Sequence, residues 1–190
     1  MAEKREQREP ESKPEQESSE RKILKRRLLQ EGLEEKDIDI SIDLGETIAQ
    51  LDFFVFGNNI PVILADFECQ QDRNTRALYA PETKKQKESY LVYVPKMSES
   101  LEEVKFYFDE NGNLTAEETN KLITTQELLL QIAAHEVRHR LQHSIKNLKT
   151  KTKTKSEKEH DSHLIEFTAV EALHRGKTLE EIAELIRENS

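Results

Sequence analysis

The sequence has a single cysteine, Cys69, and no tryptophan among its 190 residues. An internal disulfide is therefore impossible, and this cysteine usage fits a reducing compartment. The sequence also has no signal-peptide core at its N-terminus and no apolar run long enough to cross a bilayer. We therefore expect a soluble, cytoplasmic protein without membrane contact, in which Cys69 is a packed residue near a strand end rather than a nucleophile.

Apolar residues are few as well: they make up 35% of the chain, charged residues make up another 35%, and the net charge is −9. The core must be small relative to the solvated surface, and the length suits one domain with tails. The negative net charge argues against nucleic acid as the main partner. Residues 1–20 carry many charges of both signs, two prolines and no aromatic residue, and they should form a disordered tail.

One short motif stands out. Residues 135–139 read His-Glu-Val-Arg-His. Two histidines at i and i+4 lie one above the other on a helix, so both imidazoles can reach one Zn²⁺. The glutamate beside the first histidine would face water bound to that metal, where a general base is useful. The pattern predicts His135 and His139 as metal ligands and Glu136 as the catalytic base.

The motif lies in a segment that predicts a single helix. Residues 125–148 contain no glycine or proline, and Thr124-x-x-Glu127 forms a capping-box pattern at their start. At about 100° per residue, both histidines continue an apolar stripe that includes Leu128 and Ile132, whereas Arg138 points elsewhere. A buried imidazole needs a partner, which a metal would supply. The alternative is a chance motif with half-exposed histidines on an amphipathic helix.

Catalytic zinc usually takes about three protein ligands and keeps one position for water. The zincin arrangement His-x-x-Gly-x-x-His is excluded, because Gln142 and Ile145 stand where the glycine and the third histidine would be. His143 lies one turn beyond His139, too far along the axis to join the pair, and we expect it at the surface. The third ligand should therefore come from another segment.

That segment follows a lysine-rich stretch. Residues 146–158 hold six lysines and one acid without an apolar period, which predicts a mobile loop. A helix should then run from about residue 159 to residue 174 and end at Gly176. Glu166 lies on its mostly apolar face, where a carboxylate is costly unless it is paired or metal-bound.

We rank Glu166 first as the third ligand, then His163, then Glu171. The alternative for Glu166 is an ion pair with Arg138 or Arg140.

The sequence resembles the compact gluzincins at this point, and it is most similar to the ImmA/IrrE-type metallopeptidases of bacteria and phages. His135-Glu136-x-x-His139 is followed by Glu166-x-x-Ala169 on a second helix. Three strand-like runs precede the motif, at residues 60–67, 77–79 and 90–94. The resemblance covers about residues 45–175.

The resemblance implies an α+β, zincin-like fold, in which a small, mostly antiparallel sheet packs on an active-site helix and a ligand-bearing helix. It also implies zinc ligands His135, His139 and Glu166, with Glu136 as base. The chain departs from the family at Arg138, where a small residue is usual, and in the stretches 96–118 and 146–158.

Other patterns predict the remaining organisation. A helix should run from near Ser19 to Gln30 with Gly32 as its stop, so that residues 21–43 form a helix and linker. Residues 44–190 should form a single zincin-like metallopeptidase domain, which begins with a helix from Asp43 to Phe56.

A strand is expected at residues 104–108, a turn at 109–112 and a short helix from Thr115. A capping box at Thr178-x-x-Glu181 should open a final amphipathic helix.

The expected function is that of a zinc-dependent metallopeptidase, which hydrolyses peptide bonds by Glu136-assisted attack of zinc-bound water. A protein or peptide substrate would lie along the strand edge at residues 90–94. Tyr93, His163 and His174 are open alternatives for the oxyanion donor. The alternative function is a regulatory or anti-defence binding protein on a zincin scaffold, with structural zinc and contact to nucleic acid through the lysine-rich loop. The oligomeric state is not indicated.

Overall fold

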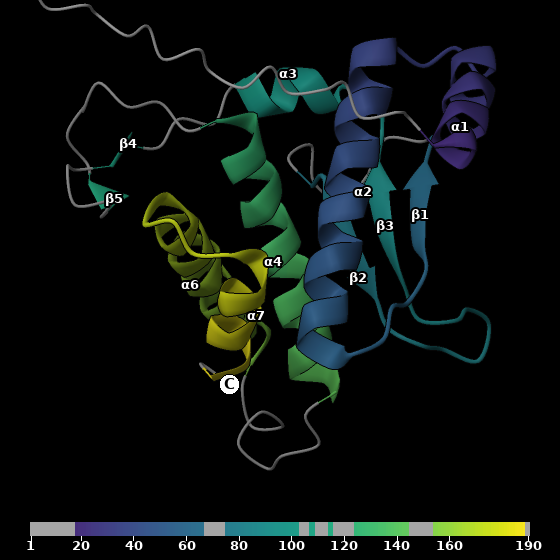
Figure 1. Ribbon diagram of the computed structural model, residues 1–190. Helices are drawn as coiled ribbons and strands as arrows, with labels where there is room; N and C mark the ends of the chain where they lie inside the picture. The colour runs from purple at the N-terminus through teal and green to yellow at the C-terminus, as the bar shows by residue number, and fades with distance from the viewer. Residues whose placement is uncertain are drawn as a thin grey trace, which may run out of the picture.

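The computed structural model describes residues 18–66, 75–102, 107–108, 114–115, 124–144 and 154–188. The protein is α+β and mostly helical, with a small mixed sheet (Figure 1). Its elements are α1 (Ser19–Gln30), α2 (Glu35–Phe56), β1 (Val62–Ala65), β2 (Ala77–Ala80), β3 (Ser89–Tyr93), α3 (Met97–Glu102), β4 (Tyr107–Phe108), β5 (Leu114–Thr115), α4 (Thr125–Ser144), α6 (Lys155–His174) and α7 (Leu179–Glu188).

The three strands that the sequence predicts form one sheet in the order β1-β3-β2. β1 pairs with β3 in parallel and β2 pairs with β3 antiparallel, so the expectation of a mostly antiparallel sheet was wrong. The central strand is β3, which was expected at the edge. The side chains of Tyr90 and Val92 on one face and of Tyr93 on the other are buried. β2 is the edge strand beside α4 (Figure 1).

Helix α1 has the predicted bounds, and Gly32 follows it with a φ of 89°. The prediction that α2 begins at Asp43 was wrong, because the helix starts at Glu35 and no linker separates Glu35 from Asp43. Its first turns are held by tertiary contacts: Ile38 and Ile42 pack with Leu28 of α1. The end of α2 is as predicted, since Gly57 follows Phe56 with a φ of 73°.

Helix α4 carries the histidine motif and begins with the predicted capping box, in which the Thr124 amide donates to Glu127 at 2.6 Å. Helix α6 ends at His174 as predicted but starts at Lys155, not near Glu159. The cause is a second capping box, in which the Thr154 amide donates to Glu157 at 2.6 Å. The end of the expected lysine-rich loop is therefore helical.

The core lies where α4 packs between α2, α6 and the sheet (Figure 1). Helix α7 contacts α2 and α6 and closes the core with Ile182 and Ile186, which are fully buried. This arrangement fixes α4 on three sides, so the side chains of its histidine motif are held between the edge strand β2 and helix α6.

Several expectations lie outside the described residues: the tail at 1–17, Cys69, the turn at 109–112, the short helix after Thr115 and loop residues 145–153. Of the strand expected at 104–108, residues 107–108 are described as β4, which pairs with β5. Within the described part of the chain, no helix combines the length and apolarity that crossing a membrane requires.

Candidate metal centre

His135 and His139 lie one turn apart on α4, as their spacing predicts, and their imidazoles face each other. The two Nε2 atoms are 2.9 Å apart. Only 14% of the His135 side chain and 19% of the His139 side chain is exposed. The helix thus presents two imidazole nitrogens at one partly buried point.

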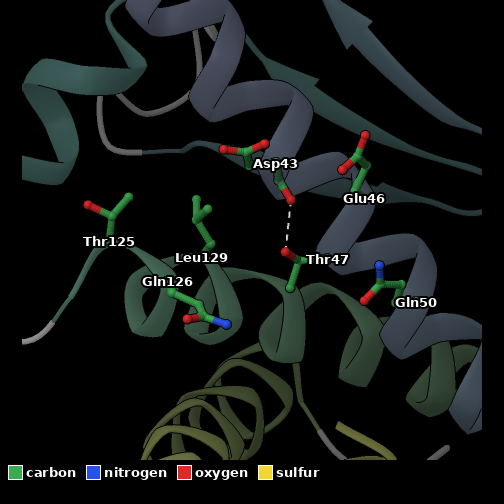
Figure 2. A pocket seen from close by; sticks show the side chains of 7 residues that line it. All are labelled: Asp43, Glu46, Thr47, Gln50, Thr125, Gln126 and Leu129. Carbon is green, nitrogen blue, oxygen red and sulfur yellow. Dashed lines mark hydrogen bonds between the residues drawn. The ribbon is translucent and has the colours of Figure 1, made fainter. Parts of the chain in front are cut away.

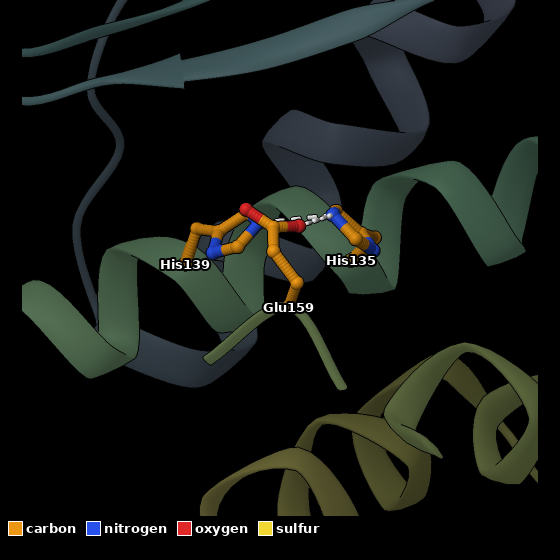
Figure 3. A group of neighbouring side chains, drawn as sticks. All are labelled: His135, His139 and Glu159. Carbon is orange, nitrogen blue, oxygen red and sulfur yellow. Dashed lines mark hydrogen bonds and ion pairs between the residues drawn. The ribbon is translucent and has the colours of Figure 1, made fainter. Parts of the chain in front are cut away.

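A carboxylate from α6 lies against this pair. Figure 3 shows the Glu159 side chain reaching toward both histidines, with its Oε2 atom 3.6 Å from His135 Nε2 and 3.4 Å from His139 Nε2. Two imidazoles and one carboxylate are a ligand set that Zn²⁺ accepts. Glu159, His135 and His139 place their ligand atoms within 4.8 Å of one another.

Glu166 meets the other side of His135. Its Oε1 atom contacts His135 Nδ1 and lies 2.8 Å from Nδ1 of His163, while Oε2 accepts from Gln131 at 2.8 Å. Burial acts to raise the pKa of Glu166, but the hydrogen bonds from His135 and Gln131 and the nearby imidazoles lower it overall. His135, His163 and Glu166 form a second possible metal-binding group, which shares His135 with the first.

The two nitrogens of His135 therefore have different partners. Nδ1 faces the Glu166 carboxylate, and Nε2 faces His139 and Glu159. A carboxylate that accepts a hydrogen bond places the proton on Nδ1 and leaves the Nε2 lone pair for a metal. Glu166 is thus brought to the site together with both predicted histidines, but on the face of His135 opposite His139.

The two facing Nε2 atoms need a proton or a cation between them, because two lone pairs at 2.9 Å repel each other. Burial would lower the pKa of His135, but Glu166, Glu136 and Glu159 raise it overall. Burial and the neighbouring His135 charge lower the pKa of His139. Without a metal, the shared proton thus belongs on His135, and a bound cation would replace it.

Glu136 points toward the sheet. Its Oε2 atom accepts a hydrogen bond of 2.6 Å from the backbone amide of Tyr79 in β2. Burial raises the pKa of Glu136 to about 7, although the His135 charge and the Tyr79 amide act to lower it. A carboxyl group with a pKa near neutrality is suited to accept and return a proton.

The two arginines of the motif region are buried, with 3% of Arg138 and 6% of Arg140 exposed. Arg138 pairs with Asp161 at 2.9 Å, and Arg140 pairs with Asp52 at 2.6 Å. Neither makes the ion pair with Glu166 that was the alternative role for this carboxylate. The burial of Arg138 follows from its place on the α6 side of α4.

Other candidates lie apart from the histidine pair or at its rim. His143 is exposed, as expected, and its ring lies 6.0 Å from that of Tyr79. Glu171 pairs with Arg175, and His174 bonds to Glu127 at the start of α4. Of the proposed oxyanion donors, His163 is at the site, with its ring 5.1 Å from that of His135.

Sequence reasoning missed Glu159 as a candidate ligand. The signal was present, because Glu159, His163 and Glu166 follow the i, i+4, i+7 spacing of one helix face. The predicted helix begins at about Glu159, whereas the capping box at Thr154 places this residue one turn inside the helix.

A separate cavity of about 300 Å³ lies between α2 and α4 (Figure 2). It is lined by Asp43, Glu46, Thr47, Gln50, Thr125, Gln126 and Leu129. None of the metal-site residues contributes to it. Arg21 binds both acidic residues, at 2.7 Å from Asp43 and 3.2 Å from Glu46, so their charge is compensated.

No family model, no curated protein and no solved structure matches this chain. The resemblance to ImmA/IrrE-type metallopeptidases therefore stays a prediction from the motif residues, and conclusions about the site rest on its geometry.

Proposed function

We propose that the protein is a zinc-dependent metallopeptidase of the gluzincin type. The observation that carries the proposal is the pair of facing Nε2 atoms of His135 and His139, with the Glu159 carboxylate against both. A structural role for two half-buried histidines does not require a buried glutamate between them, whereas hydrolysis does.

The donor atoms fit zinc, which binds imidazole nitrogen and carboxylate oxygen. His135 and His139 would hold the ion through Nε2. Glu159 supplies the third ligand in the arrangement that needs the least change, because its carboxylate already faces both Nε2 atoms. Bound zinc would supply a water molecule of lowered pKa and an electrophile for a carbonyl oxygen.

Glu166, the third ligand predicted from the sequence, is already engaged by His135, His163 and Gln131. These contacts suit a carboxylate that orients His135 through Nδ1 and makes the imidazole a better ligand. A direct bond between Glu166 and zinc stays a prediction, which variants can separate from the role of Glu159.

Glu136 would act as the base. Its Oε2 atom is held by the Tyr79 amide, so the carboxylate is fixed before substrate binds. The second oxygen, Oε1, would take the proton of an attacking water. A pKa of about 7 allows Glu136 to accept that proton and pass it to the leaving amine.

A peptide substrate would run along β2 rather than β3. The central strand β3 is paired on both sides and cannot add another strand. β2 is the edge strand beside α4. Its Tyr79 N–H is already bonded to Glu136, so an extended peptide would pair with the remaining outward backbone groups of this strand.

The experiment compares the wild-type protein with Glu136→Gln on a broad protein digest. Glu136→Gln should keep zinc and the fold but hydrolyse at least ~10²-fold more slowly, because an amide cannot take the proton. Glu127→Gln is the matched control, since Glu127 is also a buried glutamate of α4 and lies away from the site. Hydrolysis by Glu136→Gln at the wild-type rate would rule out Glu136 as the base.

The Tyr79–Glu136 hydrogen bond favours one alternative, a binding protein with structural zinc in which Glu136 ties α4 to the sheet. In that case the wild-type protein would bind zinc and cleave nothing in the digest. Most of the lysine-rich loop that could contact nucleic acid lies outside the described residues.

A further inference from the structure

The second nitrogen of His139 lies against a glutamine from the next turn of α4. Nδ1 of His139 is 3.2 Å from Gln142 Oε1 and 3.4 Å from Ser162 Oγ of α6. Gln142 is 7% exposed and Ser162 is fully buried. His139 is therefore held on the side away from His135 by side chains from both helices.

The orientation of the Gln142 amide follows from its other neighbours. Its Nε2 atom lies 2.7 Å from the Asp161 carboxylate, 3.0 Å from the Lys158 carbonyl oxygen and 3.3 Å from Ser162 Oγ. A carboxylate and a carbonyl can only accept hydrogen bonds, so the atom that faces them must be the NH₂ group. The atom that faces His139 is then the oxygen, and His139 Nδ1 must carry a proton.

Asp161 is fixed in turn by Arg138. The guanidinium donates to both Asp161 oxygens, at 2.9 Å from Nε and 3.1 Å from Nη2, and a third hydrogen bond of 2.8 Å reaches the backbone oxygen of Ile186 in α7. A bidentate arginine–carboxylate pair of this kind fixes geometry as well as charge. The chain of contacts thus runs from α7 through Arg138, Asp161 and Gln142 to His139.

We propose that Gln142, held by Asp161 and Arg138, is a positioning residue that keeps His139 in the Nδ1–H tautomer and so presents its Nε2 lone pair to the metal. The inference rests on the metal site of the proposed function. Glu166 does the same for His135 from the other side. Arg138 and Gln142, where this chain departs from the zincin patterns described above, thus both act to orient His139.

The same contacts hold the ligand-bearing helix. Asp161 and Lys158 flank Glu159 on α6, and both bond to Gln142 of α4. One side chain therefore sets the tautomer of His139 and the approach of the helix that carries Glu159. Outer contacts of this kind typically change metal affinity by about 10–100-fold when they are lost.

The test has two arms. In the metal-free wild-type protein, nitrogen-15 NMR of the histidine side chains should show His139 protonated at Nδ1, which requires no variant. In Gln142→Met, which has a similar length but neither a donor nor the amide oxygen, only the contact with His135 Nε2 would still favour the Nδ1–H form. The signal should therefore shift part of the way toward the Nε2–H tautomer. The zinc Kd of this variant, measured by chelator competition, should be about 10–100-fold weaker.

Gln126→Met on the same helix is the matched control and should behave like the wild-type protein in both arms. Wild-type His139 protonated at Nε2 when neutral, or Gln142→Met with unchanged tautomer and zinc Kd, would overturn the inference. If the proposed metal site itself is wrong, the result is different: the wild-type protein and Gln126→Met would both bind no zinc. The NMR spectra would still show whether Gln142 sets the tautomer of His139.

Discussion

The backbone amide of Tyr79 donates a 2.6 Å hydrogen bond to the Glu136 carboxylate, which ties the glutamate of the histidine motif to the edge of the sheet. The bond joins β2 to α4 in the buried interior, where an unpaired amide would be costly. Glu136 therefore has a structural partner in addition to its proposed chemical role, and variants can separate the two.

Glu136→Gln should leave stability nearly unchanged, because the amide oxygen can still accept from Tyr79. Glu136→Ala should lower the free energy of unfolding by about 1–3 kcal/mol, because the Tyr79 N–H would lose its acceptor. Urea denaturation of both variants with a chelator present measures the difference. Equal stability of Glu136→Ala and Glu136→Gln would show that the hydrogen bond contributes nothing.

The third ligand can be assigned by comparing two glutamates of α6. Glu159→Gln should weaken zinc binding more than Glu166→Gln does. The loss of zinc affinity in Glu166→Gln should stay within about 10–100-fold, because Glu166 acts through His135. Chelator competition with each purified variant gives the two dissociation constants. If Glu166→Gln abolishes binding while Glu159→Gln retains it, Glu166 is the direct ligand, as the sequence predicted.

The buried pair of Arg140 and Asp52 should be essential to the fold. The two side chains are 7% and 1% exposed, and Tyr90 also donates to Asp52 at 2.7 Å. Asp52→Ala should cost about 3–5 kcal/mol, because it removes the nearest carboxylate from a buried guanidinium whose remaining contacts, with Asn58 and Glu88, are longer. The exposed pair of Arg21 and Glu46 provides the control, and Glu46→Ala should cost less than about 1 kcal/mol. Similar losses in the two variants would contradict this account.

Acid sensitivity should depend on Glu127. Burial acts to raise its pKa, but hydrogen bonds from His174 and Thr124 lower it overall. A carboxyl group whose pKa is lower in the folded state adds stability above its unfolded pKa and loses it as pH falls. The stability difference between the wild-type protein and Glu127→Gln should therefore shrink between about pH 6 and pH 3 in denaturation experiments. If the stability difference between the two proteins stays constant over this pH range, ionised Glu127 adds no pH-dependent stability.

Local signals in the sequence located much of the fold. The capping box at Thr124 and the glycine after Phe56 mark helix ends because they satisfy backbone groups within a few residues. The start of α2 could not be read in this way. Its N-cap residue, Glu34, makes no side-chain hydrogen bond, and the first turns depend on contacts with α1 that are distant in sequence.

The site shows the same division. The spacing of His135 and His139 predicts their proximity, because it depends on one helix. The choice between Glu159 and Glu166 depends on how α6 packs on α4, and the residue spacing within one helix does not reveal this packing. The order of the strands also depends on tertiary packing. The sequence therefore predicted β3 as the edge strand beside α4, whereas β2 lies there.

The most direct test of the central claim is the metal content of the purified protein after growth with ample zinc. We expect about one zinc per chain, lost in His135→Ala and in His139→Ala. His143→Ala, which removes an exposed histidine of the same helix, should keep the metal. A wild-type protein without stoichiometric transition metal, or full zinc content in His135→Ala and His139→Ala, would contradict the account.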